Sequence, residues 1–306
     1  MKKLITLILV LLIIDGLWSG ASNLRAFELF TLPRLVLAIL AGMAYAVAGY
    51  LFQLCFKNPL ASPDIIGINA GASAGALISL SLLGSTGVIL NFGALVGSAV
   101  VCVFALLFAR PMIASNFVSR LVLIGIALSS FALSIVAYIL STMPIGQAQQ
   151  SMQWLTGTLH DADWDKNFML GIIVIIAAAL LAYYNKALSI LQLPENSAYS
   201  LGVVPQQLRA ILLAIAVILA ASATAMCGPV LFVAFLSPQL ARIIVPEEKY
   251  RPISVALTGV IFMLLADIIS QHIIPGQKYP VGAITGILGA VYLVRTTFSQ
   301  RVKVQQ

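Results

Sequence analysis

Long apolar blocks separated by short polar segments run along almost the whole chain. Six of them contain no Asp, Glu, Lys or Arg: Leu35–Phe56, Gly87–Ala109, Leu121–Leu140, Phe168–Tyr184, Ala210–Met226 and Ile253–Ala266. A helix needs about 20 mostly apolar residues to cross roughly 30 Å of hydrocarbon. Because lipid offers no water to backbone polar groups, these segments must pair them internally, as helices do. The pattern predicts an all-α polytopic membrane protein.

Weaker apolar segments raise the number of predicted spans to ten. The third contains Gly67, Gly71 and Gly75, a spacing that favours close packing of helices in membranes. The eighth has Pro229 in its first turn and Pro238 inside, where proline is expected to bend it. The predicted spans are residues 4–19, 33–56, 65–83, 87–109, 120–141, 168–187, 208–226, 229–245, 253–272 and 281–298.

The N-terminal segment has two interpretations. Lys2-Lys3 followed by Leu4–Ile14 resembles a secretory signal, with Ser19-Gly20-Ala21 as a cleavage site. Asp15 is unusual in a signal core, so we favour a first transmembrane helix with the two lysines on the cytoplasmic side.

Composition agrees with the membrane prediction. The 306 residues are 61% hydrophobic and 9% charged, with a mean hydropathy of +1.04, whereas soluble domains carry about a quarter charged residues. The net charge of +7 is spread singly or in twos and threes between apolar blocks, which excludes a nucleic-acid patch. With ten spans and both termini inside, 13 of the 17 Lys and Arg residues are cytoplasmic, as the positive-inside rule expects.

This topology treats residues 1–306 as one transmembrane domain with three long loops. Residues 20–32 and 142–167 are predicted outside, and residues 189–207 inside. In the inner loop, Pro194 and Gly202 can bracket a short amphipathic helix whose Leu193, Ala198 and Leu201 pack on a partner.

The sequence lacks the motifs of several enzyme classes. GxxxxGK[ST] and HExxH are absent, His160 and His272 are far apart, and the three cysteines form no CxxC pair, so we expect no cofactor, metal site or catalytic residue. Asp15 and Asp267 are the acids within predicted spans. Asp267 is either an ion site or, as we favour, a helix-end carboxylate bonded to a neighbouring helix. Transport energy must then come from an ion gradient or a second protein.

Several short motifs occur in a fixed order between about residues 30 and 295. They are Leu32-Pro33-Arg34, Asn58-Pro59-Leu60-Ala61-Ser62-Pro63-Asp64, Trp154-Leu155-Thr156-Gly157, Cys227-Gly228-Pro229, Ser237-Pro238-Gln239, Leu265-Ala266-Asp267 and Pro280-Val281-Gly282. Together they resemble the permeases of ABC importers for ferric siderophores, haem and cobalamin (FecCD- or BtuC-like). The resemblance implies ten helices per subunit, a permease dimer around one pathway, two cytoplasmic ATPases and an external binding protein that delivers the chelate.

The resemblance also implies roles for individual residues. The inner loop matches the segment that couples such permeases to the ATPase, here Leu193, Pro194, Glu195, Ser197, Ala198, Tyr199, Leu201 and Gly202. The cytoplasmic gate matches Asn58 and Leu60 after the second predicted span and Val118 and Ser119 before the fifth. Plain loop or helix-end packing is the alternative for both sets.

Docking of the binding protein is expected at Arg34, joined by Lys278. Some related permeases carry arginines where this chain has Thr31 and Gln271, and a glutamate where it has Lys278. These departures favour a heterodimer whose second permease subunit supplies the missing arginines. The alternative for Arg34 is an interfacial anchor.

The expected cargo is a ferric siderophore, and the Pro238-Gln239 pair resembles permeases for catecholates. Haem and cobalamin remain alternatives. Less favoured readings are an ion-coupled carrier, which would depend on Asp15 or Asp267, and a membrane-embedded enzyme.

Overall fold

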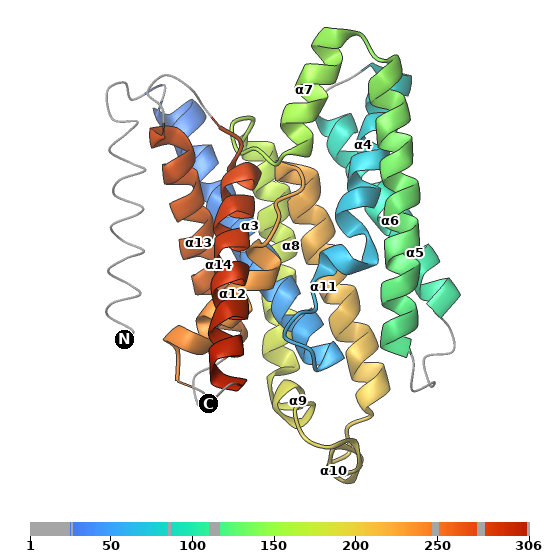
Figure 1. The fold of residues 1–306 in the computed structure, drawn as a ribbon, viewed down its shortest axis with the longest axis vertical. Helices are drawn as coiled ribbons and strands as arrows, with labels where there is room; N and C mark the ends of the chain where they lie inside the picture. Colours follow the sequence, from blue (N-terminus) through green and yellow to red (C-terminus); the bar gives the residue numbers. More distant parts are fainter. Residues whose placement is uncertain are drawn as a thin grey trace.

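The computed structural model describes Arg25 and residues 27–84, 87–109, 117–246, 251–273 and 279–304. This part of the chain is helical and contains no β-strand, which confirms the all-α prediction (Figure 1). Its elements are η1 (Phe27–Thr31), α3 (Leu32–Phe56), η2 (Pro63–Ile66), α4 (Ile68–Leu83), α5 (Val88–Ala109), α6 (Phe117–Thr142), α7 (Ile145–Leu155), α8 (Trp164–Tyr183), α9 (Asn185–Ile190), α10 (Glu195–Ser200), α11 (Pro205–Cys227), α12 (Val233–Ile244), α13 (Pro252–His272) and α14 (Val281–Val304).

Among the described residues, six helices are long and apolar enough to cross a membrane: α3 together with η1, α5, α6, α8, α11 and α13. Five of them begin and end within about three residues of the predicted spans. The exception, α8, begins at Trp164 instead of residue 168, because the Asp163 side chain accepts a hydrogen bond from the Lys166 backbone N–H and caps the helix there. The predicted span 4–19 lies outside the described residues.

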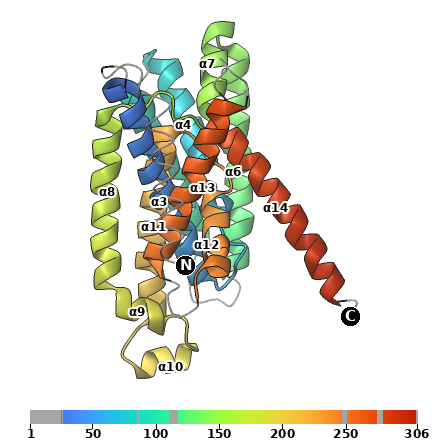
Figure 2. The ribbon, with the colours of Figure 1, turned by 90° about the vertical axis from the view of Figure 1, so that its left-hand side faces the viewer.

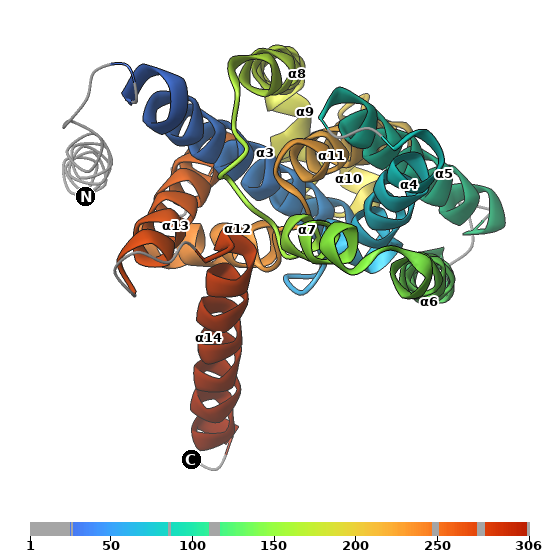
Figure 3. The same cartoon turned by 90° about the horizontal axis from the view of Figure 1, so that it is seen from above.

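Helix α3 is the centre of the bundle, with α8 and α11 on one side and α12 and α13 on the other (Figure 3). Small residues permit these close approaches. A Cβ added to Gly49 would lie 1.7 Å from the Ala234 carbonyl oxygen of α12, and one added to Gly42 would lie 2.8 Å from that of Gly259 of α13. The predicted glycine stripe is confirmed in α4, where Gly71 and Gly75 pack against backbone atoms of α5.

The third and eighth predicted spans are wrong as single helices. Helix α4 has 16 residues and α12 has 12, so at 1.5 Å per residue each is shorter than a bilayer core. Residues 57–62 are not helical and lead into the single turn of η2, and residues 228–232 are not helical either. Pro229 therefore precedes α12 rather than starting it, and Pro238 lies inside α12.

Two helices are placed in a way that the sequence did not predict. Residues 145–155, expected to be loop, form α7 at the end of the bundle opposite α10 (Figure 1). Helix α14 starts near α7 and leaves the body as it descends (Figures 2 and 3). Val281 and Ile284 at its start are buried, whereas Ile287, Val291 and Val294 are 62%, 64% and 57% exposed. We refer to the two ends of the bundle as the α7 end and the α10 end.

Candidate functional site

The segment predicted to couple to an ATPase forms the extreme tip of the α10 end (Figure 1). Helix α10 begins after Pro194 and ends before Gly202, as the sequence predicts. The Val203 N–H donates to the Ala198 carbonyl, and Gly202 has φ +77°, a left-handed conformation that favours glycine. These contacts give the tip a defined shape.

The tip presents apolar side chains. Leu193, Tyr199 and Leu201 are 41%, 46% and 59% exposed, whereas Ala198 is buried. Ser197 is exposed, and for Glu195 the structure describes only the backbone. The segment is therefore a small folded projection with an uncovered apolar surface.

The predicted gate residues Asn58 and Leu60 lie in the non-helical segment after α3. The Asn58 side-chain oxygen accepts from the Leu60 N–H at 2.9 Å, and Leu60 is 59% exposed. The segment is tied to two neighbours, since Lys57 Nζ donates to the Leu193 carbonyl at 3.5 Å and Gln239 Nε2 to the Pro59 carbonyl at 3.0 Å. Val118 and Ser119 belong to the first turn of α6, where the structure describes only the backbone.

Arg34 forms a buried ion pair at the α7 end. Its Nε and Nη2 donate to Asp267 Oδ1 at 2.9 and 2.5 Å, and Gln271 Nε2 donates to Asp267 Oδ2 at 2.9 Å. The two charged side chains are 11% and 2% exposed. The favoured reading of Asp267, a carboxylate bonded to a neighbouring helix, is confirmed. Docking of a binding protein at Arg34 stays a prediction, and Lys278 lies outside the described residues.

Three of the sequence motifs meet near the α7 end. The Thr158 N–H donates to the Cys227 carbonyl at 2.8 Å, and the Gly282 N–H to the Gly157 carbonyl at 3.1 Å. A Cβ on Gly228 would lie 2.2 Å from the Trp154 carbonyl oxygen, and one on Gly282 would lie 2.0 Å from that of Thr156. These motifs thus form one backbone junction that joins the ends of α7 and α11 to the start of α14.

The structure shows a chain of buried and partly buried polar groups that the sequence did not predict. Tyr45 Oη lies 2.9 Å from Thr224 Oγ1 and donates to the Gly228 carbonyl at 3.0 Å, and Thr224 Oγ1 lies 2.7 Å from Asn69 Oδ1. Asn69 Nδ2 in turn donates to Asp64 Oδ1. Asp64 directly precedes the third predicted span and is singled out in the sequence only as part of a motif, and its bond to Asn69 joins two elements that the sequence did not bring together.

Comparison with known proteins places the fold. Residues 6–298 match the model of the FecCD transport family. A structure of an inward-facing metal-chelate type ABC transporter superposes with a TM-score of 0.85 at 23% identity, covering 96% of this chain and 97% of that one. PsaBC of Streptococcus pneumoniae gives a TM-score of 0.63 at 16% identity, covering 96% and 98%. These structural likenesses concern the fold alone.

Curated relatives extend over nearly the same length. The chain is 31% identical to the ferric enterobactin transport system permease protein FepG of Escherichia coli, covering 96% of this chain and 95% of that protein. It is 33% identical to the Fe(3+) dicitrate transport system permease protein FecD of E. coli, covering 90% and 86%. It is 34% identical to the Fe(3+)-citrate import system permease protein YfmE of Bacillus subtilis, covering 87% and 79%. The chain therefore belongs to the FecCD transport family of permeases.

Proposed function

We propose that this multi-pass permease imports a ferric siderophore, with catecholates as the preferred class. The observation that carries the proposal is the near full-length similarity to FepG, FecD and YfmE, all named for transport of ferric chelates. Pro238-Gln239 supports the catecholate choice. A haem or cobalamin permease is the alternative, since a relative from Halobacterium salinarum, 31% identical, is named for cobalamin import.

In the proposed assembly, the permease lies in the cytoplasmic membrane. Its α10 end and both of its termini face the cytoplasm. Two ATPases dock on Leu193–Gly202, whose exposed apolar projection supports this role. Asn58, Leu60, Val118 and Ser119 form the gate on the same side, and the bond from Lys57 to the Leu193 carbonyl supports its coupling to the ATPase. A binding protein docks at the α7 end around Arg34 and Lys278.

A bulky residue at position 202 tests both the energy source and the coupling site. Gly202→Trp is expected to reduce ATP-driven uptake of ferric chelate at least about tenfold, because the indole would occupy the docking surface. Gly84→Trp is the matched control: both glycines have positive φ and nothing within 4 Å of an added Cβ, but Gly84 caps the end of α4, outside the predicted coupling segment.

Uptake is measured in proteoliposomes containing the permeases, ATPase and binding protein. Equal uptake by the two variants would contradict docking at Gly202. Uptake that persists without the ATPase and collapses with an uncoupler would instead indicate an ion-coupled carrier.

We also propose a second, non-identical permease subunit as partner, because Thr31, Gln271 and Lys278 depart from the docking pattern of related permeases. Affinity purification of this chain from its native membrane should yield a different permease at about equal amounts with it. If this chain is purified with the ATPase but with no second permease, the proposal of a heterodimer is wrong.

A further inference from the structure

The two non-helical breaks in the spans border one small pocket. Its volume is about 230 Å³, and its described lining is Leu60, Ser62, Asp64, Ile65, Leu231, Phe232, Phe235 and Leu293. Leu60, Ser62, Asp64 and Ile65 come from the segment between α3 and α4. Leu231 comes from the break before α12, and Phe232 is the N-cap of that helix. Irregular backbone at membrane depth is tolerated where it is buried in protein or lines a water-filled cavity. A pocket between two breaks is therefore a candidate for such a cavity.

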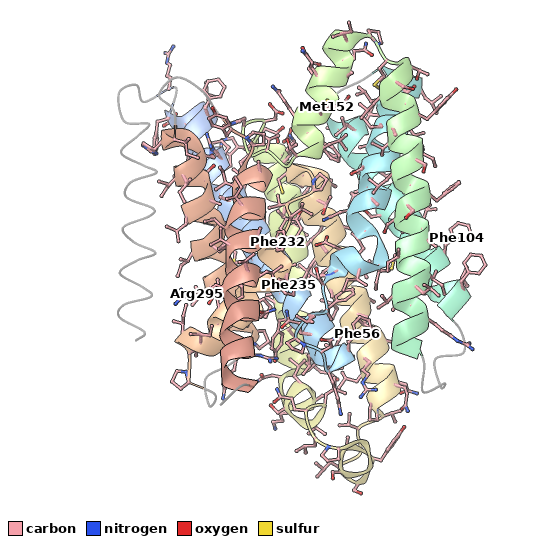
Figure 4. The ribbon with its side chains drawn as sticks, in the orientation of Figure 1. Phe56, Phe104, Met152, Phe232, Phe235 and Arg295 are labelled. Carbon is pink, nitrogen blue, oxygen red and sulfur yellow. The ribbon has the colours of Figure 1, made fainter. Side chains whose placement is uncertain are left out.

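The pocket opens at the surface of the bundle, between its two ends, and two of its lining residues, Leu60 and Leu231, are 59% and 46% exposed. A Cβ added to Gly125 of α6 would lie 2.1 Å from the Ile65 carbonyl oxygen. Gly125 is eight residues beyond the start of α6 at the α10 end, which corresponds to about 12 Å along the helix axis. Figure 4 shows Phe232 and Phe235 near mid-height of the bundle, beside α14. Asp64 thus stands at membrane depth.

Asp64 is the charged member of the pocket's described lining. Its carboxylate accepts from Asn69 Nδ2 and from Ser62 Oγ at 3.1 Å, and the residue remains partly exposed. An ionised carboxylate has about four acceptor positions, so two bonds leave acceptors for a group in the pocket. Ionisable residues inside membrane proteins are costly and usually mark a transport path.

The opposite wall of the pocket is strained. Phe232 has φ +67° and ψ −19°, a left-handed conformation that costs a non-glycine residue about 1–3 kcal/mol. The ring of Phe232 occupies the space beside Gly289 of α14, where an added Cβ would lie 2.2 Å from it. Such strain is retained mainly at functional positions, and here it holds an aromatic ring against the pocket.

We propose that Asp64 is a specificity-determining residue on the transport path, which receives positively charged or hydrogen-bond-donating groups of the passing cargo. The inference rests on the proposed transport function and adds a site to it. The carboxylate gives this pocket a negative potential, and Leu60, assigned to the gate, lies on its rim. Cargo that presents amide or hydroxyl donors is favoured here over cargo that presents carboxylates.

The potential can be measured with charged thiol reagents on the assembled transporter. The Leu60→Cys variant is prepared both with the native Asp64 and with Asp64→Asn. In each, the rates of reaction of the introduced thiol with a cationic and with an anionic methanethiosulfonate are measured. Clefts lined by one sign of charge change local ion concentrations by about tenfold or more, and Asp64 is the charged side chain of the described lining, so we expect the cationic-to-anionic rate ratio to fall several-fold in the Asn variant. A change in the intrinsic reactivity of the thiol affects both reagents equally and therefore cancels in the ratio of the two rates. The three native cysteines are buried and provide the background.

Ile145→Cys is the control, since Ile145 is 81% exposed at the start of α7, away from both the pocket and the segment proposed to dock the ATPases. Its ratio should not respond to Asp64→Asn. In the same proteoliposomes, Asp64→Asn should lower the uptake of a ferric catecholate that carries amide N–H donors relative to ferric citrate. An unchanged reagent ratio at position 60 overturns the inference, and so does an unchanged uptake ratio. Absence of uptake by the wild type would instead refute the proposed function.

Discussion

Asp267→Ala is expected to destabilise the protein by about 3–5 kcal/mol, because it leaves the Arg34 guanidinium buried without its counter-ion. The pair joins the start of α3 to the last turns of α13, two segments separated by 233 residues. Gln271 would also lose its acceptor on Asp267. Thermal unfolding in detergent, followed with a thiol-reactive dye, suits this chain, since Cys55, Cys102 and Cys227 are buried until it unfolds.

Two further variants separate the charge effect from loss of packing. Arg34→Met combined with Asp267→Leu removes both charges and should recover most of the lost stability, as replacements of whole buried pairs do. Asp161→Ala, at an exposed acid, should change the free energy of unfolding by less than about 0.5 kcal/mol. A double variant as unstable as Asp267→Ala would show that the ion pair is not the cause. If the double variant folds but no longer binds the binding protein, Arg34 also serves docking.

Gly49→Ala is expected to be at least as harmful, although it adds one methyl group. The added Cβ would lie 1.7 Å from the Ala234 carbonyl oxygen and 2.5 Å from the carbonyl carbon, so α3 and α12 must separate. Overpacking usually costs about 1–3 kcal/mol, and a backbone clash at a central helix should exceed that range. We expect the folded fraction after purification to fall strongly.

Gly171→Ala provides the matched comparison. Gly171 also lies inside a spanning helix, α8, but its added Cβ would meet only Leu40 Cδ1 at 3.8 Å, an ordinary contact. Since alanine is a better helix former than glycine by about 1 kcal/mol, this variant should be neutral or slightly more stable. Size-exclusion profiles and unfolding temperatures of the two variants give the comparison. Equal behaviour would contradict the close α3–α12 approach.

The sequence predicts the long spans well, because their signal is local. An uninterrupted apolar run such as Leu35–Phe56 must be a helix in lipid, and α3 ends where the run ends. The same signal fails at the third and eighth spans, since hydropathy does not distinguish a helix from apolar backbone that is buried in a non-helical form. Residues 228–232 are apolar, yet Gly228 at φ +75° leads the chain away from helical geometry.

Contacts between side chains of helices that are distant in the sequence were less predictable. The sequence predicts a docking group or an interfacial anchor at Arg34, from its place at the outer end of the second span, and gives no sign of the partner Asp267, which comes from α13. The inner projection was predicted with its correct limits, since Pro194 and Gly202 are local signals. The polar chain from Tyr45 to Asp64 depends on three separate elements, which no spacing rule brings together.

The two short helices, α4 and α12, have a consequence for how the protein is made. A segment of 12 residues such as α12 offers a translocon too little apolar length for independent insertion, so it should enter the bilayer together with α11 or α13 as a hairpin. Residues 57–62 gain their final surroundings only after α12 has been synthesised, since Gln239 Nε2 of α12 donates to the Pro59 carbonyl. Nascent chains truncated before α12 should therefore remain open to proteases at Ala61 and Ser62, which are buried in the folded protein, and protection there should follow the insertion of α12.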